Sequence, residues 1–153
     1  MPGKTVSVFS LLVGTVGATL LTVGMATSYW CKGGTGLWKN CAVNGCLAVQ
    51  ATIVISTVFG IVHALILLLH LAKQVGPDTR KIIMSAFMSA LLTVIFGVAS
   101  IIVYAVRLEA FQPSFYGWSF ALTLVGIGII FLNIFVIVFE GSNQRAAGAY
   151  SSI

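Results

Sequence analysis

IIMSAFMSALLTVIFGVASIIVYAV, the stretch from Ile82 to Val106, contains no Asp, Glu, Lys or Arg. A bilayer core accommodates roughly 20 consecutive apolar residues as a helix, so this stretch is long enough to cross a membrane. Three further runs also lack these residues: Thr5 to Cys31, Ala42 to Ala72 and Ala110 to Phe139. After trimming residues typical of the membrane interface, we predict helices over residues 6–27, 49–71, 82–106 and 118–139.

Little of the 153-residue chain remains outside these spans: a loop at 28–48, two short connections and a tail at 140–153. This remainder is too small for a second domain, so we expect a single domain over 1–153. Short connections make neighbouring helices antiparallel. The expected fold is an all-α integral membrane protein, an antiparallel four-helix transmembrane bundle. Its helices should pack through small residues: Gly14 and Ala18, then Ser56, Gly60 and Ala64, then either Ser85 with Ser89 or Ala86 with Ala90.

Composition excludes several classes of protein. Hydrophobic residues make up 59% of the chain and charged residues 7%, whereas an average soluble domain is about a quarter charged. A soluble monomer is therefore excluded. The net charge of +5 comes from scattered basic residues, which argues against a nucleic-acid partner. The three acids, Asp78, Glu109 and Glu140, lie outside the apolar runs, so carboxylate-pair catalysis and an intramembrane proton relay lack their residues. We expect a non-enzyme without a cofactor.

Basic residues near the span ends predict the orientation, because the cytosolic side carries the excess. One side has five and the other three: Lys4, Lys73, Arg80, Lys81 and Arg145 against Lys32, Lys39 and Arg107. Both termini should therefore be cytosolic, with loop 28–48 outside and tail 140–153 inside. Residues 26–28 have the small-residue pattern of a signal-peptidase site, but the preceding run is long for a signal peptide, so we expect the first span to be retained.

All three cysteines lie in this first loop, on the side where disulfides persist. We expect two to be bridged, which leaves one free, paired with another chain or buried. Asn44-Gly45 is typical of a two-residue hairpin turn. That turn would bring Cys41 and Cys46 within reach of each other on one face of a β-hairpin. By residue type alone, the loop's Tyr29, Trp30 and Trp38 indicate an aromatic belt at the membrane interface.

The spacing of the tryptophans and cysteines in this loop resembles that of a known family of membrane proteins. Trp30, then Gly36-Leu37-Trp38-x-x-Cys41, then Cys46 resembles the signature of the claudin, peripheral myelin protein, epithelial membrane protein and lens fibre membrane protein superfamily. The stretches Leu47 to Thr52 and Phe115 to Phe120 resemble the family's entries to spans two and four. The resemblance implies a left-handed four-helix bundle with a small extracellular sheet, a Cys41–Cys46 disulfide, and Trp30, Gly36, Leu37 and Trp38 anchoring the sheet.

The resemblance also implies a function. We expect a structural protein of the plasma membrane that acts in cell–cell contact or membrane organisation through its first extracellular loop. The loop is about half as long as in sealing claudins, so a paracellular channel is not expected. An alternative is an accessory subunit that binds an ion channel or receptor through its helices. A remote alternative, a small four-span membrane enzyme, needs a Glu-Arg pair that no span contains.

Two further sets of residues stand out. The ending Ser151-Ser152-Ile153 fits a PDZ scaffold, which binds such C-termini by strand addition, with Ser151 and Ile153 as its contacts. His63 and His70 are seven residues apart in span two, roughly 10 Å, which is too far for both to bind one metal directly. We therefore expect these histidines, and Asn133 in span four, to form hydrogen bonds between helices. Other partners should be the lipid bilayer and other membrane proteins.

Overall fold

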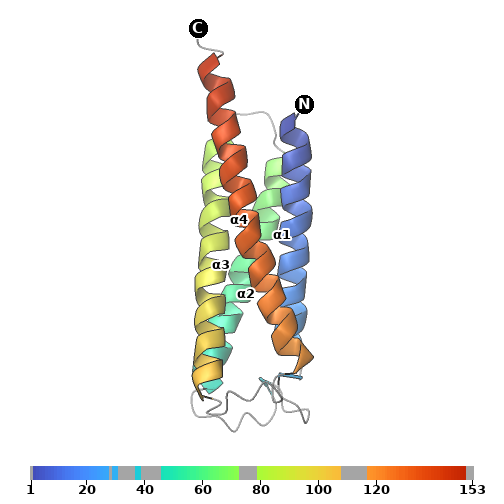
Figure 1. The fold of residues 1–153 in the computed structure, drawn as a ribbon, viewed down its shortest axis with the longest axis vertical. Coiled ribbons are helices and arrows are strands. Elements are labelled where there is room, and N and C mark those ends of the chain that lie inside the picture. The colour runs from blue at the N-terminus through green and yellow to red at the C-terminus, as the bar shows by residue number, and fades with distance from the viewer. Residues whose placement is uncertain are drawn as a thin grey trace.

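The described part of the chain forms four long helices, and neighbours along the chain run in opposite directions (Figure 1). The computed structural model describes residues 2–27, 29–30, 37–38, 46–72, 79–107 and 117–150. The helices are α1 (Pro2–Ala26), α2 (Cys46–Ala72), α3 (Thr79–Arg107) and α4 (Trp118–Tyr150). The start of α1 and the end of α4 lie at the same end of the bundle.

The four predicted spans are confirmed. Thr5–Ala26, Leu47–Ala72, Arg80–Val106 and Trp118–Phe139 are helical, apolar and long enough to cross a bilayer. The outside of the bundle carries large apolar side chains such as Leu12, Leu132 and Phe135, each about 60% exposed. Small and polar side chains, including Ser56 and Thr93, are fully buried between the helices. This inverted distribution is that of a multi-pass membrane protein, because lipid tails solvate the apolar exterior.

The helices differ from the prediction mainly at their ends. α1 and α2 each begin a turn or so before the predicted residue, and α4 continues past Phe139 to Tyr150. The expected tail is therefore helical over most of its length. This extension contains Gln144, Arg145 and three alanines, all strong helix formers, and it contains no proline. The extension also contains the weak helix formers Gly141, Ser142, Asn143 and Gly148. It therefore continues a helix that the apolar span has already started, where each added residue gains one backbone hydrogen bond.

The predicted β-hairpin is not supported. The residues that the structure describes contain no β-strand. Helix α2 begins at Cys46, directly after Asn44-Gly45, so positions 46–48 are helical where a strand returning from that turn would lie. Residues 39–45, which hold the turn and Cys41, lie outside the described part of the chain.

Packing is tightest within two helix pairs, α1 with α4 and α2 with α3. Between α1 and α4, a Cβ atom at Gly126 would lie 2.9 Å from the carbonyl oxygen of Gly17 and 2.8 Å from the amide of Leu21. Backbones this close are possible only where a side chain is missing. Of the two small-residue faces expected on α3, Ala86 and Ala90 are both buried, whereas Ser85 is exposed.

Candidate functional site

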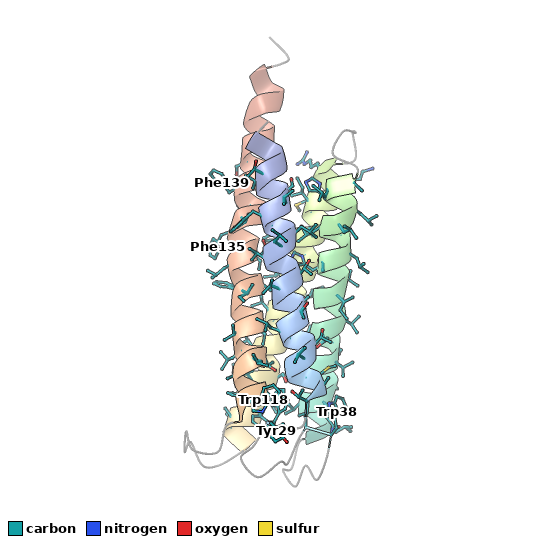
Figure 2. The ribbon with its side chains drawn as sticks, turned by 90° about the vertical axis from the view of Figure 1, so that its right-hand side faces the viewer. Tyr29, Trp38, Trp118, Phe135 and Phe139 are labelled. Carbon is teal, nitrogen blue, oxygen red and sulfur yellow. The ribbon has the colours of Figure 1, made fainter. Side chains whose placement is uncertain are left out.

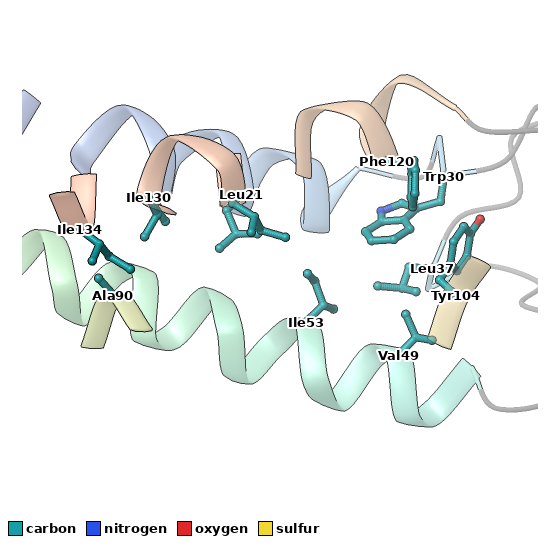
Figure 3. Close-up of a cluster of buried hydrophobic side chains, with 11 residues drawn as sticks. Leu21, Trp30, Leu37, Val49, Ile53, Ala90, Tyr104, Phe120, Ile130 and Ile134 are labelled. Carbon is teal, nitrogen blue, oxygen red and sulfur yellow. The ribbon is translucent and has the colours of Figure 1, made fainter. Parts of the chain in front are cut away.

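The end of the bundle away from the chain termini carries a group of residues that we call the aromatic cap (Figures 2 and 3). It consists of four loop residues and the first residue of α4: Tyr29, Trp30, Leu37, Trp38 and Trp118. Trp30 is completely buried. Its ring meets Tyr104 of α3 edge-on at 5.0 Å and Phe120 of α4 edge-on at 5.8 Å, between ring centroids. Trp30 thereby fills the end of the hydrophobic core.

Two of the three indole groups of the cap, those of Trp30 and Trp38, complete the C-terminus of α1. The last carbonyl groups of a helix lack partners within the helix. The Trp30 indole N–H donates to the carbonyl of Gly24 at 2.8 Å, and the Trp38 indole N–H donates to the carbonyl of Met25 at 2.9 Å. Tryptophan suits this position because it combines a donor with a large apolar ring. The Trp38 ring is half-exposed, so it also contributes to the surface of the cap.

Leu37 ties the cap to α2. Its side chain is buried, and its carbonyl oxygen accepts a hydrogen bond from the side-chain amide of Gln50 at 2.6 Å. Gln50 lies one turn inside the start of α2. The loop is therefore held on α1 through Trp30 and Trp38 and on α2 through the Gln50 amide.

A third set of bonds joins residues 29–30 to the start of α4. The amide N–H of Gly117 donates to the carbonyl of Trp30 at 2.8 Å, and that of Ser119 donates to the carbonyl of Tyr29 at 3.3 Å. The Ser119 hydroxyl accepts a bond from the Tyr29 amide at 3.2 Å. A Cβ atom at Gly117 would overlap the Tyr29 carbonyl, so this approach requires glycine. The Tyr29 and Trp118 rings stack alongside, with centroids 5.6 Å apart.

The predicted site residues differ in burial, and the structure describes only some of them. Trp30 and Leu37 are buried anchors and Trp38 is a half-exposed one. Gly36, Cys41, Ser151 and Ile153 lie outside the described residues, as does the side chain of Cys46, so the disulfide and the PDZ motif stay predictions. Sequence analysis did not single out Gly24, Gln50 or Ser119 as partners. Gln50 carried a usable signal, because it is a long polar side chain at the entry to an apolar span.

A buried polar network joins all four helices nearer the other end of the bundle. Asn133 of α4 accepts a hydrogen bond from the Ser10 hydroxyl at 3.0 Å and donates through Nδ2 to the Ser10 carbonyl at 3.1 Å. The same Nδ2 lies 3.1 Å from Nε2 of His63 on α2. Nδ1 of His63 lies 3.0 Å from the carbonyl of Ala86 on α3. The expected bonding of His63 and Asn133 between helices is therefore present.

The protons of this network have one consistent arrangement. The carbonyls of Ser10 and Ala86 only accept, so Asn133 must turn its NH₂ group toward Ser10 and His63 must carry its proton on Nδ1. Nε2 of His63 then accepts from Asn133. Gly14 leaves the space for these groups, because a Cβ atom there would lie 2.9 Å from Nδ2 of Asn133. His70, the other histidine of α2, lies 3.5 Å from the Ser7 hydroxyl.

The cap and the buried polar network both hold parts of the chain together through non-covalent contacts. The cap consists of aromatic contacts and hydrogen bonds to backbone groups, and the network consists of neutral side chains between helices. Within the described ranges, no three His, Cys, Asp or Glu side chains come together as a metal site. The sequence matches no protein-family model, and it matches no curated protein sequence.

Proposed function

We propose that this chain is a claudin-like four-span structural protein of the plasma membrane, with both termini cytosolic and no catalytic role. It acts in cell–cell contact or membrane organisation through its first extracellular loop, residues 28–48. The observation that carries the proposal is the attachment of this loop by its two tryptophans to the last carbonyls of α1. Three residues of the quoted signature, Trp30, Leu37 and Trp38, are anchors of the kind that the family resemblance implies.

Anchoring of this kind suits a contact surface. Segment 31–36 lies between Trp30 and Leu37, which are both attached to the bundle. Segment 39–45 lies between Trp38, which is bonded to α1, and Cys46, the first residue of α2. A loop with fixed ends loses less conformational entropy when it binds a partner than a free loop does. We propose that a Cys41–Cys46 disulfide further restricts the second segment, since closing a short loop limits its unfolded states.

The cytosolic part of the proposal concerns the C-terminus. Helix α4 continues to Tyr150 and extends beyond the other helices (Figure 1). The last three residues, Ser151-Ser152-Ile153, follow this helix directly. We propose that they bind a PDZ scaffold, with the helical extension separating the scaffold from the membrane surface.

Cell clustering tests the contact function. Deleting the whole loop would also remove the Leu37 and Trp38 anchors, so the variant should change the surface and keep the anchors. Replacing residues 39, 40, 42, 43 and 44 with serine retains Trp38 and Cys41. Cells expressing this variant should cluster no more than mock-transfected cells, whereas the unchanged chain should produce clusters. Surface labelling with an extracellular tag measures how much protein reaches the membrane.

A matched replacement of five residues in the second outer segment, residues 109–113 to serine, is the control and should leave clustering intact. If the first variant clusters as well as the unchanged chain at equal surface level, the contact function is wrong. The accessory-subunit alternative then takes its place, and co-purification in mild detergent would identify the channel or receptor. Mixing expressing with non-expressing cells further separates self-recognition from recognition of another surface protein.

A further inference from the structure

One buried hydrogen bond joins the two closely packed helix pairs, α1 with α4 and α2 with α3. It runs from Nδ2 of Asn133 on α4 to Nε2 of His63 on α2, over 3.1 Å. Both side chains are completely buried. The bond lies nearer the end of the bundle that contains the chain termini, because Asn133 is closer to the end of its span at Phe139 than to the start at Trp118. It therefore holds the two pairs together in that half of the bundle.

This bond requires a neutral His63. Nδ1 of His63 donates to the carbonyl of Ala86, so Nε2 is free to accept from the Asn133 amide. A proton added to Nε2 would oppose the N–H groups of Asn133. Turning the amide over would bring its oxygen to Nε2, but the same oxygen would then face the carbonyl of Ser10, which can only accept. Neither orientation of the Asn133 amide satisfies a protonated His63.

The described surroundings of His63 offer no charge that could compensate a proton. The groups around its ring are Ser10 and Gly14 on α1, Ala86 and Ser89 on α3, and Asn133 on α4. The other histidine of α2, His70, is seven residues further along the helix. The charged side chains that the structure describes, Arg80 and Lys81, are exposed at the start of α3. A buried charge without a partner is costly, so a protonated His63 favours an arrangement in which water reaches it.

His70 also makes a contact between the two pairs, but this contact tolerates a proton. Nε2 of His70 lies 3.5 Å from the hydroxyl of Ser7 on α1. A hydroxyl can rotate and accept a hydrogen bond as well as donate one. A protonated His70 can therefore keep its partner, whereas a protonated His63 loses Asn133.

The aromatic cap joins the same two pairs at the opposite end through uncharged groups. Trp30 donates to the carbonyl of Gly24 on α1 and packs its ring against Tyr104 on α3. Indole and phenol groups carry no charge near neutral pH. The contacts of the cap should therefore be unaffected by a change in pH that protonates a histidine.

We propose that His63 and Asn133 form a pH switch inside the bundle. Protonation of His63 breaks its bond with Asn133, and the α1–α4 pair moves away from the α2–α3 pair at the end that contains the termini. The two pairs stay joined at the aromatic cap, and deprotonation restores the bond. This switch is independent of the contact function proposed for the first loop.

Distances between spin labels on the full chain in lipid nanodiscs test the switch. Labels at Val8 of α1 and Leu68 of α2 report on the end with the termini, and labels at Val23 and Val54 of the same helices report on the end with the cap; all four side chains are exposed. The labels are introduced as unnatural amino acids, because the chain has cysteines of its own. Lowering the pH from about 7.5 to about 5, across the usual histidine pKa of about 6.5, should lengthen the first distance by a few ångström and leave the second unchanged. An unchanged first distance would overturn the proposal.

Two variants of α2 identify the responsible group. His63→Gln keeps an oxygen that can accept from Asn133 but cannot be protonated near neutral pH, so its distances should not respond to pH. His70→Gln is the matched control on the same helix and should keep the full response. A response that survives in His63→Gln would show that another group moves the helices, and the proposed switch would be wrong. Circular dichroism checks that both variants are folded.

Nitrogen NMR of the unchanged chain, labelled at its histidines, gives a measurement that does not depend on any variant. His63 should be neutral, with its proton on Nδ1, at the higher pH. It should carry protons on both nitrogens at the pH where the first distance changes. A His63 ring that is still neutral at that pH would contradict the proposal.

Discussion

The buried network gives a prediction with a definite magnitude. Asn133→Leu keeps a similar side-chain volume but removes three hydrogen bonds, two to Ser10 and one to His63. Interhelical hydrogen bonds in a bilayer contribute about 0.6 kcal/mol each on average, so the variant should lose about 2 kcal/mol of unfolding free energy. Reversible unfolding in mixed micelles, followed by circular dichroism, measures this loss. His63→Leu, combined with Asn133→Leu in a double-mutant cycle, should give a coupling of about 0.6 kcal/mol for their shared bond.

Ser142→Ala is the matched control for that experiment. Ser142 lies on the same helix, is exposed and bonds only to the carbonyl one turn earlier, so its loss should change the unfolding free energy by less than about 0.5 kcal/mol. The reasoning fails if Asn133→Leu is as stable as the unchanged chain, or if the cycle gives no coupling. Either result would mean that the buried amide contributes volume to the packing and little else.

Three further predictions concern the cap and its surroundings. Gly117→Ala should destabilise the protein by at least about 2 kcal/mol, because its Cβ would overlap the backbone carbonyl of Tyr29. Gly128→Ala is the control and should be tolerated, because no atom lies within 4 Å of its Cβ. Thermal unfolding compares the stability of the two variants. Trp30→Phe keeps an aromatic ring but loses one hydrogen bond and part of the buried ring volume, so it should cost at least about 1 kcal/mol in the same assay. Mass spectrometry without reduction should find one intramolecular bridge, between Cys41 and Cys46, and a single alkylated third cysteine; three alkylated thiols would contradict this pairing.

The spans could be predicted from the sequence because a bilayer imposes a simple constraint on it. Charged residues are excluded from the core, so runs without them mark the helices, and Ile82 to Val106 needed no other signal. The positions of the helix ends depend on interactions other than the exclusion of charge from the bilayer core. The end of α1 depends on indole groups that lie several residues further along the chain. The extension of α4 to Tyr150 lies beyond the apolar run, so hydrophobicity alone does not indicate it.

The roles of single residues were only partly predictable. Trp30 and Trp38 are equivalent by type, yet one is buried and the other half-exposed, because Tyr104 and Phe120 enclose only Trp30. These partners are far away in sequence, and the spacing of the tryptophans does not indicate them. A hydrogen bond from His63 to another helix could be predicted, because a polar side chain inside a membrane span needs a partner. Its particular partners, however, depend on the rotation of each helix about its axis, which a charge-free run does not specify.

The aromatic cap and the buried polar network together fix the tilt and rotation of the helices, which burial in lipid alone would not determine. In a bilayer the hydrophobic effect does not drive helices together, so packing and hydrogen bonds must determine their rotation. On α1 the network at Ser10 and the cap at Gly24 are roughly 21 Å apart, given the rise of a helix. Each region joins α1 to both α2 and α4. A single attachment would allow α1 to pivot, whereas two widely separated ones set both its tilt and its rotation. The described loop anchors Trp30, Leu37 and Trp38 therefore have a fixed position relative to the whole bundle.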